Sequence, residues 1–116
     1  MVIAPAALLV ACGAAMSAPT QRLADAQSAQ RAAQELGAAK HPSAQLHMRL
    51  AEEQMAEAKA LMSEGENERA DALLVRAKAD SELAVALARE QKAALELQQA
   101  SKQAKATMTT IQGAGQ

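Results

Sequence analysis

The chain has 116 residues, half of them apolar and 32 of them alanine, and it contains no Phe, Tyr or Trp. Strands favour aromatic and β-branched side chains, so this composition argues against most β folds and in favour of helix. The 12 basic and 13 acidic residues are interspersed and give a net charge of −1. Nucleic-acid binding requires a basic stripe and, for single strands, stacking aromatics, and the sequence offers neither. We therefore predict a single all-α domain.

The first eleven residues, MVIAPAALLVA, carry no charged side chain. This segment is too short to span a bilayer, which takes about 20 apolar residues, but it fits the apolar region of a secretory signal. Such signals normally begin with Lys or Arg, and none precedes Cys12. We therefore predict that residues 1–11 are a signal peptide of the lipoprotein type whose basic region lies upstream of Met1.

The segment Leu9-Val10-Ala11-Cys12 resembles the lipobox of bacterial lipoproteins. The resemblance implies that the thiol of Cys12 takes a diacylglyceryl group and that a signal peptidase cleaves between Ala11 and Cys12. Two or three acyl chains would anchor the protein stably in a membrane. By the same resemblance Gly13, rather than Asp, favours the outer membrane, and residues 12–19 form a lipidated tether. The alternative is an apolar N-terminus with one unreactive cysteine.

The first predicted helix covers residues 21–36, with Thr20 as its N-cap after Pro19. Gly37 follows the last periodic residue and is expected to take the left-handed conformation that ends a helix. Residues 38–42 form a short connection. The apolar face of this helix is expected to contain Leu23, Ala26, Ala29, Ala33 and Leu36.

The second predicted helix begins at Pro42 or Ser43 and ends before a turn at residues 63–67. Steps of three and four residues predict one buried seam on this helix. A methionine stripe at this spacing is more typical of core filling than of a copper(I) site. The seam contains Met48, Ala51, Met55, Ala58 and Met62, and an adjacent strip contains Leu46, Leu50 and Leu61.

The third predicted helix begins near Glu66 and ends near Ala106, so the helical domain covers residues 20–106 and residues 107–116 form a disordered tail. Because the core material is scarce, we expect the part beyond Ala88 either to self-associate or to be exposed and mobile. The predicted seam contains Ala70, Leu74, Ala77, Ser81, Ala84, Ala88, Gln91 and Leu95. A second strip contains Leu73, Leu83, Leu87, Ala94 and Leu97.

The turn and the helices beside it resemble one tetratricopeptide unit, which places small and large apolar residues at fixed distances around a Gly turn. The tryptophan, first leucine and closing proline of that motif are replaced by Gln54, Glu57 and Glu82. A single unit cannot build a peptide-binding groove, so we predict a helical hairpin and not a solenoid. The matching positions are Ala58, Leu61, Gly65, Ala70, Leu74 and Ala77.

The order of lipobox, Ala- and Gln-rich helix, Pro-initiated helix and Gly turn is similar to that of the domain-of-unknown-function 4398 family, over about residues 5–105. The resemblance implies an exported helical hairpin, which in this family sometimes accompanies peptidoglycan-binding modules, and it implies no established reaction. The predicted fold is therefore a three-helix antiparallel hairpin or bundle with a long C-terminal helix.

Catalytic or metal-binding patterns are weak in this sequence. His41 and His47 lie six residues apart, which is not a metal-ligand spacing on a helix, so we expect surface or capping roles for them. The acidic side chains are expected to form a solvated helix face. We predict no catalytic residues, no metal, no cofactor and no small-molecule substrate.

The favoured function is that of a non-enzymatic lipoprotein of the outer envelope, with a structural or interaction role and either an envelope partner or a homo-oligomer. One alternative is a periplasmic binding module, chaperone-like, that grips partners with its Ala/Leu/Met seam. A lesser alternative is a coiled coil similar to murein lipoprotein. That protein type is linked through a C-terminal lysine, whereas the last lysine here is Lys105 and Gly37 and Gly65 break the heptads.

Overall fold

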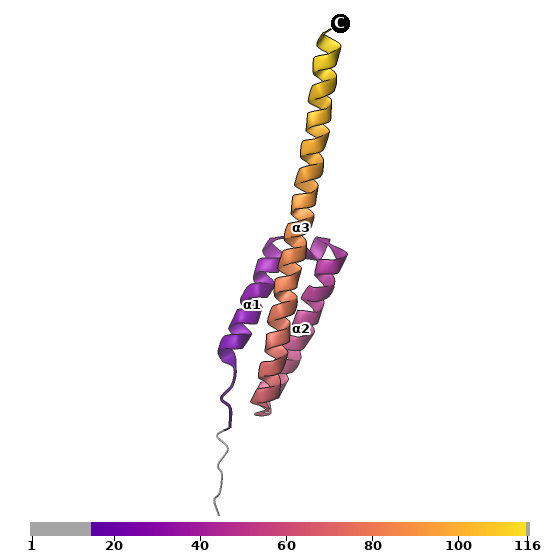
Figure 1. The fold of residues 1–116 in the computed structure, drawn as a ribbon. Coiled ribbons are helices and arrows are strands. Elements are labelled where there is room, and N and C mark those ends of the chain that lie inside the picture. The colour runs from indigo at the N-terminus through magenta and orange to yellow at the C-terminus, as the bar shows by residue number, and fades with distance from the viewer. Residues whose placement is uncertain (1–14, 116) are drawn as a thin grey trace, which may run out of the picture.

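A computed structural model describes residues 15–115 of the chain. They form the helices α1 (Thr20–Glu35), α2 (Pro42–Ser63) and α3 (Asn67–Ala114), with a short 3₁₀ helix, η1 (Ala38–Lys40), between the first two. No strand occurs in this part of the chain. Figure 1 shows α1 and α2 beside the first half of α3, whose second half projects alone. The predicted all-α fold with a long C-terminal helix is confirmed.

The ends of α1 follow from the residues that flank it. The helix begins one residue earlier than predicted: Pro19 is the N-cap and Thr20 is already helical, so the predicted Thr20 cap is wrong. The Pro19 carbonyl accepts the first helical bond from the Leu23 amide at 3.1 Å. At the other end Gly37 has φ +75°, the left-handed conformation that was predicted.

Proline and glycine also fix the ends of α2. Pro42 occupies the first turn, where its missing N–H removes no helical bond. After α2 the chain turns through Gly65, which has φ +80°. The Gly65 amide donates to the Met62 carbonyl at 3.2 Å and the Glu66 amide to the Leu61 carbonyl at 2.9 Å. These two bonds make a Schellman motif, which reverses the chain so that α3 runs back along α2.

Small residues at the interface let the three helix axes approach closely. The buried side of α3 follows the predicted steps of four and three residues, and α2 contributes the predicted Met and Ala seam. The packed side chains form two clusters, one at each end of the bundle. Buried in the cluster near the α2–α3 turn are Ala26, Ala51, Met55, Ala58, Leu61, Ala70, Leu74 and Ala77. Buried in the cluster near η1 are Ala33, Ala38, Ala44, Met48, Ala84 and Ala88.

Burial on α3 ends where its neighbours end. Gln91 and Leu95 were predicted to extend the seam, but both are exposed, as is every residue from Arg89 to Gly115. The connection from α1 through η1 to α2 lies at the level of Ala88. Among the described residues, no other helix therefore runs beside α3 beyond Arg89 (Figure 1). The prediction that the seam continues to Leu95 is therefore wrong.

The helix nevertheless continues to Ala114, eight residues beyond the predicted end at Ala106, so the predicted disordered tail is largely helical. No proline interrupts this segment, and three threonine hydroxyls donate to the carbonyl four residues earlier, each at 3.0 Å. The 26 residues from Arg89 to Ala114 make a rod of about 39 Å at 1.5 Å per residue. Of the helices in the described part of the chain, none is both long and apolar enough to cross a membrane.

Candidate functional site

The predicted anchor, Leu9-Val10-Ala11-Cys12, lies outside the residues that the structure describes. The first described residues leave the bundle at its α2–α3 turn. There the Asn67 side-chain amide donates to the Met16 carbonyl at 2.7 Å, and Pro19 is buried. The N-terminal segment therefore departs from one end of the bundle, whereas the projecting part of α3 leaves from the other (Figure 1).

The residues predicted to pack around the helix turn come together on α2 and α3. The five apolar ones lie in the cluster next to the turn, each at most 7% exposed. Gly65 forms the turn itself, and a Cβ placed there would meet no atom within 4 Å. The glycine is therefore required by its positive φ and not by lack of space. The five apolar residues are Ala58, Leu61, Ala70, Leu74 and Ala77.

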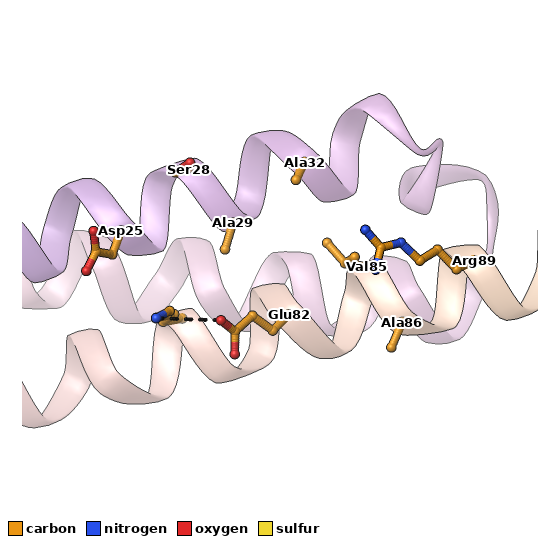
Figure 2. Close-up of a pocket in the computed structure, with 9 residues that line it drawn as sticks. Asp25, Ser28, Ala29, Ala32, Glu82, Val85, Ala86 and Arg89 are labelled. Atoms are coloured by element: carbon orange, nitrogen blue, oxygen red, sulfur yellow. Dashed lines mark ion pairs between the residues drawn. The ribbon is translucent and has the colours of Figure 1, made fainter.

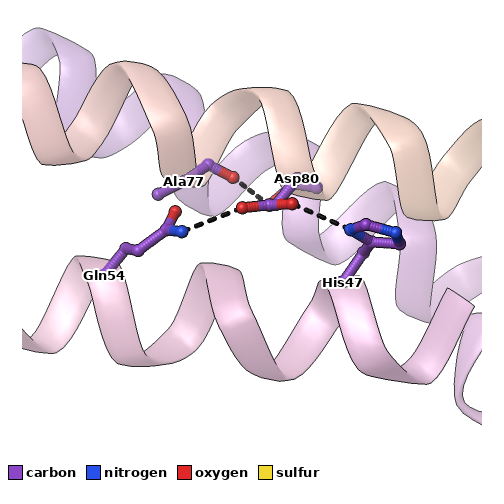
Figure 3. A network of polar contacts seen from close by, with 5 residues as sticks. His47, Gln54, Ala77 and Asp80 are labelled. Carbon is purple, nitrogen blue, oxygen red and sulfur yellow. Dashed lines mark hydrogen bonds and ion pairs between the residues drawn. The ribbon is translucent and has the colours of Figure 1, made fainter.

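A polar network between α2 and α3 was not predicted from the sequence. Asp80 on α3 accepts from His47 Nδ1 at 2.8 Å and from Gln54 Nε2 at 2.9 Å, both on α2 (Figure 3). Beside it the buried Ser81 hydroxyl donates to the Ala77 carbonyl at 2.8 Å. His47 and Gln54 lie two helical turns apart, so one carboxylate joins two levels of α2.

This network is placed to hold α2 and α3 in register. The side chains of His47 and Asp80 are 25% and 20% exposed, so the pair is partly shielded from water. The Gln54 Oε1 atom is buried and has no hydrogen-bond partner within residues 15–115. His47 is therefore hydrogen-bonded at the interface between α2 and α3 and does not have the surface role expected for it. His41 is the N-cap residue of α2, but its side chain makes no capping bond.

The first helix is tied to the other two by separate polar contacts. Arg22 on α1 forms an ion pair with Asp71 on α3. Gln30, also on α1 and only 9% exposed, donates to the carboxylate of Glu52 on α2 at 2.9 Å. Glu52 is exposed, as predicted for the acidic face, and its carboxylate also accepts from this buried amide.

An open groove of about 550 Å³ runs between α1 and α3 (Figure 2). Its floor is made of small side chains, and its charged residues alternate in sign. Lys78 and Glu82 form an ion pair with each other at 3.6 Å, on the α3 side. The groove therefore has neither a strong net charge nor a large apolar surface. Its lining consists of Asp25, Ser28, Ala29, Ala32, Lys78, Glu82, Val85, Ala86 and Arg89.

The methionines of α2 lie where core side chains lie. Met48 and Met55 are 8% and 4% exposed and belong to the two apolar clusters, so the core-filling interpretation is confirmed for them. Met62 is half-buried and packs against the cluster near the turn. Among the described residues, no group of three or more His, Cys, Asp or Glu side chains is arranged to hold a metal ion.

The surface with the largest exposed apolar side chains is the projecting part of α3. Leu97, Met108 and Ile111 are 73%, 62% and 67% exposed. Leucine-sized side chains at this exposure on a lone helix are unusual for a helix that packs only within its own chain. Of the three, only Leu97 belonged to the predicted second strip, whereas Met108 and Ile111 lie in the segment predicted to be a disordered tail.

The fold and these surfaces define a small all-α protein in which a three-helix bundle carries a projecting helix at the end opposite its N-terminal segment. The family described as a domain of unknown function (DUF4398) matches residues 21–100, and the chain belongs to this family. The match includes the whole bundle and the first part of the projecting helix. No curated protein and no solved structure matches the chain.

Proposed function

We propose that the protein is a non-enzymatic lipoprotein of the bacterial outer envelope that is anchored through Cys12 and presents the projecting part of α3 to a partner. The lipobox-like segment at residues 9–12 supports the anchor. The observation that carries the interaction role is that the N-terminal segment and the projecting helix leave the bundle at opposite ends. The N-terminal segment leaves at the α2–α3 turn, and about 39 Å of exposed helix leaves at the other end.

This separation suits an anchored interaction protein for a physical reason. A lipid anchor at Cys12, three residues before Ala15, would place the α2–α3 turn of the bundle nearest the membrane. The projecting helix would then begin at the end of the bundle far from the anchor, where a partner could contact it without displacing the bundle. Since the bundle buries its own seam, binding does not compete with folding.

The binding-module alternative takes a different form on this fold. The alanines of the α2 seam and its residues Met48 and Met55 are buried inside the bundle, so they cannot bind a partner while the bundle is folded. A binding surface would instead use the exposed side chains Leu97, Met108 and Ile111. This surface is compatible with the anchored interaction role and does not require a separate function.

The anchor is tested by the intact mass of the protein purified from membranes of cells that express it from its native locus. The expected mass is that of residues 12–116 plus two or three acyl chains. Cys12→Ala should abolish acylation, whereas the matched tether substitution Ser17→Ala should leave it unchanged. An unmodified chain that begins at Met1 and fractionates with soluble proteins would contradict the proposal.

The outer-membrane location is tested separately by sorting. Gly13→Asp should move the acylated protein from the outer to the inner membrane fraction, and Gly13→Ser should not. Equal distribution of the two variants between the membranes would show that residue 13 does not decide the location. That outcome would not affect the test of acylation, which is the mass measurement.

A further inference from the structure

The exposed apolar side chains of α3 follow a heptad pattern. Nine positions separated alternately by four and three residues run from Leu83 to Ile111, and we call them the outer stripe. All the large apolar side chains that are exposed on α3 beyond Asp80 belong to it, except Leu95. The outer stripe consists of Leu83, Leu87, Glu90, Ala94, Leu97, Ser101, Ala104, Met108 and Ile111.

The outer stripe does not continue the buried seam of the bundle. Leu97 lies nine residues after Ala88, which is about two and a half turns, so the two side chains point to opposite sides of α3. The side of the projecting segment that does continue the seam carries mostly polar residues, among them Gln91, Gln98 and Lys102. Extending α1 or α2 would therefore not cover the outer stripe.

The length of the outer stripe is that of a coiled-coil seam. It spans 29 residues, or four heptads, and sustained heptads over three or four repeats are typical of helix pairing. A lone helix of 26 residues gains little in water from propensity, and its stability comes mainly from packing of an apolar face. A second helix with the same seam would supply that packing.

We propose that the outer stripe pairs with the outer stripe of a second copy of this chain, and that the two helices run antiparallel. The proposal goes beyond the envelope function above and does not depend on acylation of Cys12. The orientation follows from charge. A parallel pair in register would place the two Glu90 carboxylates opposite each other inside the seam, which is unfavourable.

An antiparallel pair centred on Gln99 removes this repulsion. Glu90 then lies opposite Met108 of the second copy and one turn from that copy's Lys105. The acidic residues of the projecting segment, Glu90 and Glu96, both precede residue 100, whereas residues 101–114 carry two lysines and no acidic side chain. The half that contains these two carboxylates, residues 89–100, also carries Arg89 and Lys92, so its net charge is zero. An antiparallel pair therefore places each basic end over a neutral half, whereas a parallel pair in register would place the two basic ends side by side.

The same alignment also pairs apolar layers. Leu87 lies opposite Ile111 of the second copy, Ala94 opposite Ala104, and Leu97 opposite Ser101. Leu87 already packs against the cluster near η1, so the pair would continue that cluster outward. The two bundles would lie at opposite ends of the pair, with about 96 Å between the two Asn67 residues measured along the helix axis.

The oligomeric state of the full chain with Cys12→Ser tests the pairing without lipid or disulfide. Sedimentation equilibrium should show a monomer–dimer equilibrium. Leu97→Glu should raise the dissociation constant at least about tenfold, because it puts a charge into the seam. Leu95→Glu, a matched leucine on the other side of the same segment, should leave it within about twofold. Circular dichroism should show a folded bundle in both variants.

The orientation is tested by a spin label on Gln112→Cys in the same Cys12→Ser chain. The antiparallel pair centred on Gln99 separates the two labelled positions by about 39 Å, and a parallel pair brings them within about 20 Å. A short distance would overturn the antiparallel assignment. A chain that stays monomeric at its highest soluble concentration, or equal weakening by Leu95→Glu and Leu97→Glu, would overturn the pairing.

Discussion

The two halves of α3 differ in burial although they form one continuous helix. From Asn67 to Ala88, every third or fourth residue is buried against α1 or α2. From Arg89 to Gly115 every residue is exposed. Both halves are rich in Ala and also contain Leu, Glu, Lys and Arg, which are strong helix formers. The comparison shows that helix-favouring residues do not decide burial, which depends on the presence of a neighbouring helix.

The exposed half has its own apolar side, which is turned away from the bundle. Leu97 and Ala88 point to opposite sides of α3, so the change is in direction as well as in exposure. The first half is therefore built for packing within the chain, whereas the second is suited to packing with another helix. Substitutions at matched positions in the two halves test this comparison.

The largest expected difference in the free energy of unfolding is between truncating a buried leucine and truncating an exposed one. Leu74→Ala should lower the free energy of unfolding by about 2–5 kcal/mol, because Leu74 is fully buried among small residues that leave a cavity. Leu95→Ala should change it by at most about 0.5 kcal/mol, since Leu95 is half exposed. Urea denaturation of the two variants measures both values. Equal losses would mean that the second half is buried in solution on the side of Leu95.

A smaller difference in the free energy of unfolding is expected between removing a carboxylate from the first half of α3 and removing one from the second half. Asp80→Ala should cost about 1–2 kcal/mol, because it leaves His47 and Gln54 without their shared acceptor at a partly shielded interface. Asp80→Asn keeps one acceptor oxygen and should cost less. Glu96→Ala, which removes an exposed pair with Lys92 at 3.9 Å, should cost at most about 0.5 kcal/mol. The same denaturation curves compare them, and similar values for Asp80→Ala and Glu96→Ala would show that the network does not stabilise the bundle.

The smallest effect is expected at glycines. Gly65→Ala should cost about 1 kcal/mol, because a Cβ is disfavoured at φ +80° although there is room for it. Gly113→Ala lies inside the exposed helix, where alanine is the better helix former, so helicity should be kept or rise. Thermal melts followed by circular dichroism measure the first effect and helical content the second. A neutral Gly65→Ala would mean that the turn relaxes without strain.

Much of the bundle could be predicted because its signals are local. The Gly37 and Gly65 stops and the Pro42 start depend on backbone conformations that few other residues favour. The seam on α2 could be read from the spacing of its methionines and alanines. The predicted Thr20 cap failed because the Pro19 carbonyl already accepts the first helical bond, and the predicted end at Ala106 failed because loss of apolar periodicity does not end a helix.

The polar contacts could not be predicted because their partners are far apart in the chain. Asp80 is 33 residues from His47 and 26 from Gln54, and no local spacing joins them. Similarly, Glu52 is exposed as predicted, but its bond to Gln30 could not be predicted, because it exists only where α1 packs on α2.

The sequence by itself determined that the protein is helical, where its two turns lie, and which side of each helix is apolar, since propensity and periodicity are properties of neighbouring residues. Only the tertiary structure decided where burial on α3 stops, because that limit is set by where α1 and α2 end. It also decided that the outer stripe is exposed from Glu90 onward, because exposure depends on which neighbouring helices are present.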